Sequence, residues 1–447
     1  MNTELTTITL ILVTKKRLLL FRYGYAQRMK LPIGGYEFMD EAEIEESFTD
    51  MLRDYNQDTI GLQEGFIAEV DLSYPEHLHH LHESYPLAPH PFTPRPEDLS
   101  DYQNKCHSVL NTKPSTVKKL SATFLKREKY VVHALNLKLY QRLGMKIEKV
   151  HRVLTFQECE FLRKYINFCT DMRSKSTTKI GSRFWKLMNN SVFGKWIEDT
   201  SKYINMGFAT NAEFAKKSMS NPKFKHFMVI NEKLIGLTFE RKKQEVKQAV
   251  AIGFSILELS KELMYRTYYE KIVPSLGEKC RVLFSDTDSL FISCESENPL
   301  RKLKSILDTS NFDKSHPLRS LDRKSKVGYF KSEVGSSKIS KFIGLRSKVY
   351  SFISDDGRVA KCKGVSKNYQ KNLQFLHFEK CLSEICSVST PQRNLISQKH
   401  KIMLAKQQKL CFSSYDDKFY IKSCGIHTTP FGSKKQLSRD DKCDVCK

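Results

Sequence analysis

The feature that most constrains the fold is the stretch CRVLFSDTDSLFIS, from Cys280 to Ser293. An apolar run stands on each side of a short acidic segment, which predicts two buried strands joined by a tight turn. Upstream, apolar residues recur at helical spacing from Gln244 to Ile272, and Pro274 and Gly277 are expected to end that helix. A long buried helix followed by a hairpin predicts an α+β core, in which helices cover one side of an antiparallel sheet.

The acidic segment carries two carboxylates, Asp286 and Asp288, one residue apart. Side chains of a strand repeat every two residues, so both can approach one face of the hairpin. Charge placed beside a core is costly unless a partner offsets it, and Mg²⁺ prefers carboxylate and phosphate oxygens. The same pattern also occurs in solvated turns and in glycosyltransferases that bind a metal and a nucleotide-sugar, so the motif alone leaves the chemistry open.

A second motif, RFWKLMNNSVFGK, runs from Arg183 to Lys195 and predicts a helix that ends at Gly194. Lys186 and Asn190 are four residues apart and share one face of that helix, and Phe193 lies one turn further on. Upstream basic residues extend the face into a cationic stripe, namely Lys175, Lys179 and Arg183. Such a stripe can hold a triphosphate while an aromatic ring stacks on a base. The alternative is an ordinary solvated basic face.

The composition points to a polyanionic partner. The chain has 74 Lys and Arg residues against 50 Asp and Glu residues, a formal charge of +24 over 447 residues. Nucleic acid or an anionic membrane surface would suit this surplus. The longest apolar run, Ile8 to Val13, is far shorter than the roughly 20 residues of a membrane span. It is either a strand or a segment foreign to the fold.

Cysteine and histidine give weaker signals. The twelve cysteines are scattered, as in a reduced compartment, and no address signal indicates a location within the cell, nuclear or cytoplasmic. The terminal pair Cys443 and Cys446 resembles half a zinc site, but no second cysteine pair or histidine pair accompanies it. The irregular stretch 75–115, rich in Pro and His, reads as an inserted loop with solvated histidines rather than as a metal site.

Three motifs together resemble a known family. KLMNNSVFG is similar to the fingers motif K-x3-N-S-x-Y-G of family B DNA polymerases, with Phe193 in place of tyrosine. FSDTDS is similar to the palm motif Y-x-D-T-D-S, and GLRSKVYSF to the K-x-Y motif, with Lys348 and Tyr350 matching. The motifs occur in the family's order. Over about residues 23–430 the sequence resembles the protein-primed branch found in Polinton/Maverick-type mobile elements and related viruses.

This resemblance implies a DNA-directed DNA polymerase, a nucleotidyltransferase of DNA replication. Asp286 and Asp288 would bind two Mg²⁺ ions that activate the primer 3′-hydroxyl and stabilise the leaving pyrophosphate. Lys186 would neutralise the incoming dNTP, and Asn190 and Phe193 would pack against the new base pair. Lys348 and Tyr350 would hold the primer terminus of a DNA primer-template. Tyr23 would close the sugar pocket against a 2′-hydroxyl. Whether a terminal protein serves as the primer stays open.

The resemblance also implies a right-hand architecture: an antiparallel-sheet palm with helices on one face, helical fingers and a mixed thumb. The expected division is a non-matching segment over 1–22, the N-terminal part of the palm with an inserted loop region over 23–150, fingers over 151–205, palm over 206–365, and thumb with a basic tail over 366–447. The exonuclease domain that usually precedes these parts is expected to be absent.

One metal ligand is missing from the family pattern. A motif D-x-x-x-L-Y should end at Tyr23, but the residue five positions earlier is Leu18. Asp71, in EVDLSYP, is the competing candidate, although the resemblance places that stretch downstream of the metal motif. We therefore expect an N-terminally truncated or wrongly joined copy with impaired activity. The alternative is a catalytically dead relic that only binds DNA.

Overall fold

The computed structural model describes residues 8–13, 20–59, 61–200, 203–240, 249–286, 289–324, 326–398 and 401–437, with backbone alone for 8–13, 20–22, 398, 401, 435 and 437. No helix within these ranges is both long and apolar enough to cross a membrane. The predicted mixed α+β class is confirmed.

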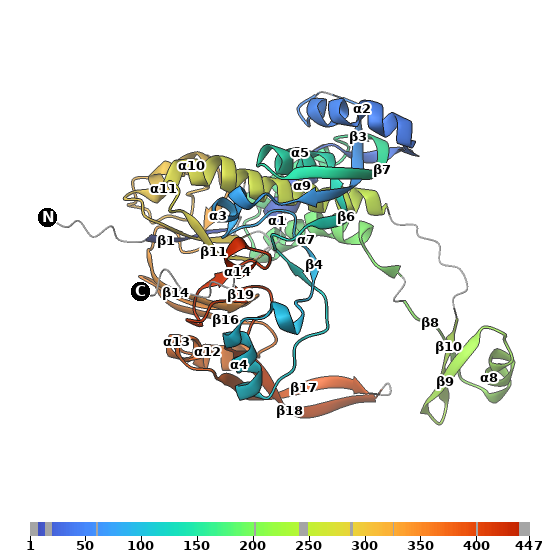
Figure 1. Cartoon of the computed structure of the whole chain (residues 1–447). Coiled ribbons are helices and arrows are strands. Elements are labelled where there is room, and N and C mark those ends of the chain that lie inside the picture. Colours follow the sequence, from blue (N-terminus) through green and yellow to red (C-terminus); the bar gives the residue numbers. More distant parts are fainter. Residues whose placement is uncertain are drawn as a thin grey trace.

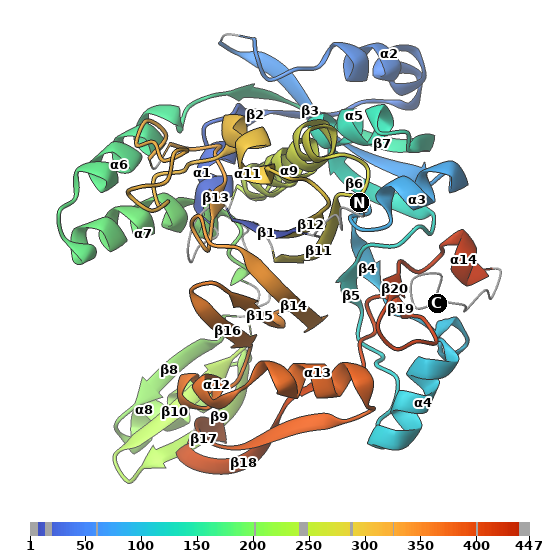
Figure 2. The same ribbon diagram turned by 90° about the vertical axis from the view of Figure 1, so that its left-hand side faces the viewer.

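A seven-stranded sheet forms the centre of the molecule (Figure 2). Its order is β11-β12-β1-β14-β15-β16, with β13 as a further partner of β1, and each pair is antiparallel. The strands are β1 (Ile8–Val13), β11 (Arg281–Asp286), β12 (Ser289–Cys294), β13 (Lys331–Ser332), β14 (Ile339–Arg346), β15 (Val349–Ser354) and β16 (Gly357–Cys362). Of the two interpretations of the first apolar run, the structure shows the strand.

The long buried helix covers one face of this sheet. Helix α9 (Val250–Thr267) continues through a π-helical turn, Tyr268–Ile272, into α10 (Val273–Leu276). Its buried side chains join those of β11 and β12 in one cluster that includes Met264, Tyr268, Val282, Leu290 and Ile292. The other face carries a largely aromatic cluster, whose described members come from the strands and the loop before β14.

The predicted helix end is half right. Gly277 does end the helical run, because its φ of +92° is left-handed backbone that glycine adopts without strain. Pro274 does not end it, since it lies in the first turn of α10, where a missing N–H costs little. The expected start at Gln244 lies outside the described residues.

A second sheet of order β2-β7-β3-β6 packs against α2 and α5. The strands are β2 (Leu31–Phe38), β3 (Gln63–Ser73), β6 (Arg127–His133) and β7 (Lys146–Cys159), and the helices are α2 (Glu41–Asp54) and α5 (Ala134–Arg142). LPIGGYEF, despite its adjacent glycines, is a bulged strand rather than a turn, and Tyr130–His133 is the end of strand β6, which pairs with β3.

Two antiparallel helices, α6 (Arg163–Lys175) and α7 (Lys179–Trp196), form the predicted helical region (Figure 2). The Thr178 side chain caps α7 by accepting a hydrogen bond from the N–H of Gly181 at 3.0 Å, so that glycine does not break the helix. Helix α1 (Leu20–Ala26) packs against α7 and α9.

Residues 205–239 form a small unit that projects from the body of the chain (Figure 1). It consists of β8 (Asn205–Ala209), α8 (Ala212–Met219), β9 (Phe224–Asn231) and β10 (Leu234–Phe239), in the sheet order β8-β10-β9. The boundaries expected for fingers, palm and thumb stay predictions.

The inserted region and the C-terminal region lie together (Figure 2). The Gln103 side chain donates hydrogen bonds to the carbonyls of Asp416 and Phe419, at 2.9 and 3.1 Å. The insertion is more ordered than expected, and His82 is buried rather than solvated.

The remaining elements of the chain are short helices, strands and 3₁₀ turns. They are α3 (His79–His82), β4 (His90–Phe92), α4 (Asp101–Leu110), β5 (Lys119–Ser121), α11 (Pro299–Lys302), α12 (Lys367–Asn372), α13 (Phe375–Ser383), β17 (Ser387–Gln398), β18 (Lys401–Ser413), β19 (Tyr420–Ile421), β20 (Thr428–Thr429) and α14 (Lys434–Leu437), with 3₁₀ turns at Glu76–Leu78, Pro96–Asp98 and Lys304–Ile306.

Candidate active site

The acidic motif stands at the tip of the β11–β12 hairpin. Asp286 is the last residue of β11 and pairs with Ser289, the first residue of β12, whose hydroxyl donates to the Asp286 carbonyl at 3.2 Å. The two predicted strands are confirmed as an antiparallel pair. Thr287 and Asp288 form that connection and lie outside the described residues, so the position of the second carboxylate stays a prediction.

Lys348 meets this tip from a neighbouring hairpin. It lies in the two-residue turn between β14 and β15, where Arg346 pairs with Val349, and its φ of +63° is left-handed. A left-handed residue other than glycine costs free energy that a functional contact can offset. The Lys348 ammonium forms an ion pair with the Asp286 carboxylate, and the two side chains are 40% and 30% exposed. Two motifs that are 62 residues apart thus meet at one point.

Tyr350 packs beneath the same point. Its ring centroid lies 5.1 Å from that of Phe284 and 5.0 Å from that of Phe291, within the aromatic cluster of the central sheet. Burial raises the pKa of the Tyr350 hydroxyl well above its ordinary value, and the negative charges of Glu333 and Asp286 raise it further. The phenol therefore stays protonated at neutral pH and can donate a hydrogen bond.

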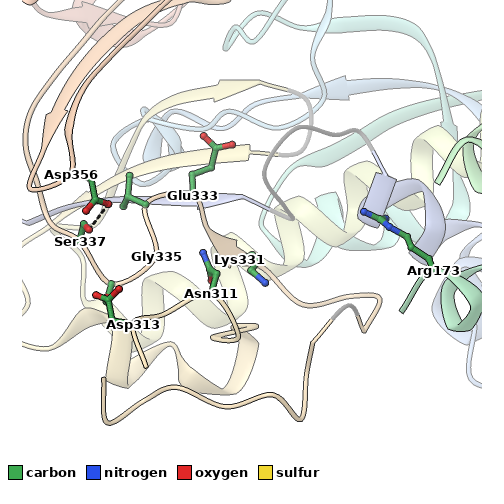
Figure 3. Close-up of a pocket in the computed structure, with 10 residues that line it drawn as sticks. Arg173, Asn311, Asp313, Lys331, Glu333, Gly335, Ser337 and Asp356 are labelled. Atoms are coloured by element: carbon green, nitrogen blue, oxygen red, sulfur yellow. Dashed lines mark hydrogen bonds between the residues drawn. The ribbon is translucent and has the colours of Figure 1, made fainter. Parts of the chain in front are cut away.

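A pocket of about 430 Å³ lies beside this cluster (Figure 3). Arg173 of α6 lines it together with Lys331, Glu333 and Asp356, so the helical hairpin and the central sheet share its wall. Figure 3 shows the Glu333 side chain pointing away from Asp313. Sequence reasoning missed Glu333 and Arg173, because neither belongs to a motif.

On the helical side, Tyr23 and Phe193 are brought together. Their rings stack with centroids 4.4 Å apart and planes at 18°, and Tyr23 is only 7% exposed. The Gln27 side chain ties the two helices by donating to the carbonyls of Tyr23 and Asn189, at 3.1 and 3.3 Å. Two residues 170 positions apart in the sequence therefore form one aromatic wall.

Lys186 and Asn190 both lie half-buried on α7. Within the described part of the chain, the side-chain oxygen of Asn190 is buried without a hydrogen-bond partner. A buried unpaired acceptor is uncommon and is often satisfied by a ligand or water. The cationic stripe is shorter than expected, since Lys175 ends α6 and forms an ion pair with Asp171 at 2.7 Å.

Asp71 lies in the other sheet. It is part of β3, where its carboxylate accepts hydrogen bonds from the N–H of Lys129 at 2.9 Å and from His151 at 2.8 Å. These two contacts hold the pKa of Asp71 below its ordinary value, the backbone N–H having the larger effect. The carboxylate is thus already engaged by groups away from the β11–β12 hairpin.

Strand β1 runs beside the acidic hairpin. Val13, its last residue, pairs with Ser289 of β12, and the chain then leads through 14–19 into α1. Those connecting residues, which include Leu18, lie outside the described ranges. Within the described residues, no group of three Asp, Glu, His or Cys side chains is arranged to hold a metal ion.

This backbone is similar to solved structures of Phi29 DNA polymerase. One crystal form of that enzyme matches with a TM-score of 0.51 and 13% identity, over 91% of this chain and 59% of the polymerase. The chain has a DNA polymerase fold. The complex of the Phi29 enzyme with single-stranded DNA matches with a TM-score of 0.50 and 14% identity, over 91% of this chain and 58% of that one. The polymerase fold here thus spans less than two thirds of the Phi29 chain.

No protein-family model matches the sequence, and no curated protein matches it significantly. At this identity, the structural similarity establishes the fold alone. The functional argument therefore depends on the residues of the site.

Proposed function

We propose that this chain catalyses DNA-templated transfer of deoxynucleotides, as a DNA-directed DNA polymerase of the protein-primed family B type. The observation that carries the proposal is the contact between Asp286 of the β11–β12 hairpin and Lys348 of the β14–β15 turn, within a chain of polymerase fold. A mobile-element or viral origin, and priming by a terminal protein, belong to the same proposal and depend on the sequence resemblance.

The acidic tip suits Mg²⁺. The Asp286 carboxylate is partly exposed at a hairpin end, and Asp288 follows two residues later in the sequence, so two carboxylates would be available as hard oxygen donors to the ion. Asp286 and Asp288 would hold the ion. When bound, Mg²⁺ would supply the positive charge that stabilises the phosphoryl oxygens and the leaving pyrophosphate.

The side chains of Lys348, Tyr350 and Lys186 would each have a separate role. Lys348 would bind the primer-terminal phosphate, and its ion pair with Asp286 positions the primer end beside the acidic tip. Tyr350 would support it as a neutral hydrogen-bond donor. Lys186 would neutralise the incoming triphosphate as a point charge.

The aromatic wall would select the sugar and the base pair. Tyr23 would close the pocket against a 2′-hydroxyl, and Phe193 behind it keeps that ring in place. Asn190 would present its unpaired oxygen towards the new base pair. A ring that is held firmly would clash with a 2′-hydroxyl, and such a clash discriminates against the ribonucleotide.

Primer extension with Mg²⁺ and the four dNTPs tests the proposal. Because the position five residues before Tyr23 is Leu18, we expect weak templated extension, strengthened by Leu18→Asp and abolished by Asp286→Asn in both backgrounds. Asp355→Asn, at an exposed position, is the matched control and should leave extension unchanged. Loss of extension in Asp71→Asn with no gain in Leu18→Asp would show that the third ligand is assigned wrongly.

The competing proposal is a relic that binds DNA without catalysis, which the missing aspartate favours. It predicts salt-sensitive DNA binding that Asp286→Asn does not change, and no extension even after Leu18→Asp. Absence of DNA binding at low salt would contradict both proposals.

A further inference from the structure

Two cysteines are in contact at the end of helix α13, outside the candidate active site. Cys381 lies in the last turn of that helix and Cys386 lies just before β17, and their Sγ atoms are 3.2 Å apart. Both are free thiols. Since a disulfide bond is about 2.05 Å long, the two sulfur atoms would need to approach by only about 1 Å more to form one.

Backbone contacts hold the short connection that joins the two cysteines. The N–H of Cys386 donates to the Ser414 hydroxyl at 3.0 Å, and the N–H of Ser414 donates to the Cys386 carbonyl at 3.1 Å. The same hydroxyl donates to the Glu384 carbonyl at 2.9 Å. Because Ser414 directly follows β18, the connection is fixed at the base of the β17–β18 hairpin. Two thiols that the fold keeps in contact react with each other at a high effective concentration.

The two thiols differ in exposure, and this difference sets the order in which they react. Cys381 is 1% exposed and belongs to the core cluster that includes Phe375, Phe378 and Phe412. Burial, followed by the contact with Cys386, raises the pKa of the Cys381 thiol to about 12. Cys386 is half-buried and packs against the edge of that cluster. A reagent in solution can therefore reach Cys386 first.

We propose that Cys381 and Cys386 form a site of reversible oxidation, which a small-molecule disulfide such as oxidised glutathione converts into an internal disulfide. The Cys386 thiolate attacks one sulfur of the reagent, so that a mixed disulfide forms and the first glutathione thiolate leaves. Cys381 then loses its proton to solvent and attacks the Cys386 sulfur, which releases the second glutathione thiolate. Two electrons pass from the protein to the reagent, and the two protons end on the released thiols.

The internal disulfide would close the short loop 381–386 and join α13 covalently to the start of β17. Closing a loop removes conformations from the unfolded chain, so the oxidised protein should resist unfolding better than the reduced one. In a reducing compartment such bonds are transient or sense the redox state, rather than serving as permanent cross-links. The competing explanation is a weak contact between two thiols in an apolar core, without any chemistry.

The chain offers a direct measurement, because both cysteines lie in one tryptic peptide, CLSEICSVSTPQR (381–393), which has no third cysteine. The full-length chain is incubated with excess oxidised glutathione, alkylated, digested and analysed by mass spectrometry. We expect this peptide to lack alkyl groups and to be lighter by two hydrogen atoms, and to take up two alkyl groups after treatment with dithiothreitol. A peptide that keeps both thiols free, or that carries glutathione without an internal bond, would overturn the proposal.

Single variants test the order of reaction. Cys381→Ser lacks the second thiol, so Cys386 should accumulate a stable mixed disulfide with glutathione. Cys386→Ser should leave Cys381 unmodified, because that thiol is buried. Cys159→Ser, which changes a half-buried cysteine of β7, is the matched control and should form the internal disulfide as the unaltered chain does. Glutathione on Cys381 in place of Cys386 would contradict the order.

A measurement on the unaltered chain covers the case in which a variant fails to fold. At a fixed ratio of reduced to oxidised glutathione, the equilibrium constant for the internal disulfide should be at least about tenfold smaller in urea than in buffer, because the unfolded chain no longer holds the two sulfur atoms in contact. Equal constants in the folded and unfolded chain would show that the fold does not prepare this pair for oxidation.

Discussion

His82 is a buried imidazole whose protonation opposes folding. Its Nδ1 lies 2.5 Å from the Tyr74 hydroxyl, and its ring centroid lies 4.7 Å from that of Tyr269. Burial lowers its pKa to about 4 from an ordinary value of 6.5, with smaller effects from neighbouring histidines. Between pH 6.5 and about 4, His82 therefore takes up a proton in the unfolded chain but not in the folded chain.

The stability that neutral His82 contributes is fully present above pH 6.5 and is lost as the pH falls towards 4. We expect the free energy of unfolding to fall by roughly 2–3 kcal/mol more in the unaltered chain than in His82→Gln over that range. Urea denaturation across that pH range measures it, with His226→Gln at an exposed position as control. Equal acid sensitivity in His82→Gln and the unaltered chain would contradict the assignment.

Asp286, Lys348, Tyr23 and Phe193 were singled out as candidate site residues by spacing and resemblance, and their roles stay predictions. Their pairing was not predictable, because the ion pair and the ring stack each join positions far apart in the sequence. His82 was wrongly expected in solvent. The Pro- and His-rich composition indicates a loop, but it does not show that His82 packs against Tyr74.

At the scale of elements, Glu258 joins α9 to the second sheet. It is 3% exposed, and its carboxylate and carbonyl both accept from the Asn136 side chain, at 2.9 and 2.7 Å. The backbone N–H of His133 also donates to the carboxylate, at 3.4 Å, and Lys261 forms an ion pair with it. The carboxylate thus serves two elements at once.

Glu258→Ala should lower the free energy of unfolding by about 3 kcal/mol, because buried donors lose their acceptor. Glu258→Gln keeps one acceptor oxygen and should cost less. Glu213→Ala, on an exposed position of α8, is the control and should change stability by under about 0.5 kcal/mol. A Glu258→Ala cost no larger than the control would mean that the helix is held without this contact.

The β17–β18 hairpin is the element that we expect to hold DNA through charge. Arg393 and Lys406 are directly paired across it, and both are exposed. If both contact phosphates, Arg393→Gln/Lys406→Gln should reduce the slope of log affinity against log salt concentration by about two. Fluorescence anisotropy with a primer-template duplex measures that slope.

The matched control removes two exposed lysines away from that hairpin, Lys271 of the π-helical turn and Lys279 of the turn before β11. That variant has the same change in net charge and should keep a steeper slope than the hairpin variant. Equal slopes in the two variants would show that the hairpin has no special part in binding.

Elements were predicted well where the pattern was local. The buried face of α9 follows from apolar spacing alone. Adjacent glycines such as Gly34 and Gly35 are typical of a turn, and only the pairing with the distant strand β7 shows that they form a bulge here. Helix α4 was missed, although Ser100 and Gln103 form a capping box that signals its start.

At the scale of the whole molecule, the order of three motifs was enough to indicate a polymerase fold, and the structure shows that fold. The sequence did not reveal how the C-terminal region returns to the insertion, because Gln103 meets its partners more than 300 residues away. Long-range packing of this kind depends on the shapes of both surfaces rather than on local patterns.

The central claim is that the acidic hairpin tip and helix α7 border one metal–nucleotide site. Backbone cleavage by Fe²⁺ with ascorbate and peroxide tests it, because Fe²⁺ substitutes for Mg²⁺ at oxygen ligands and cuts only nearby chain. With DNA and dNTP present, the account predicts cuts near Asp286 and also within α7 near Lys186 and Asn190, both abolished by Asp286→Asn. Cuts confined to the hairpin, or cuts near Asp71 instead, would contradict it.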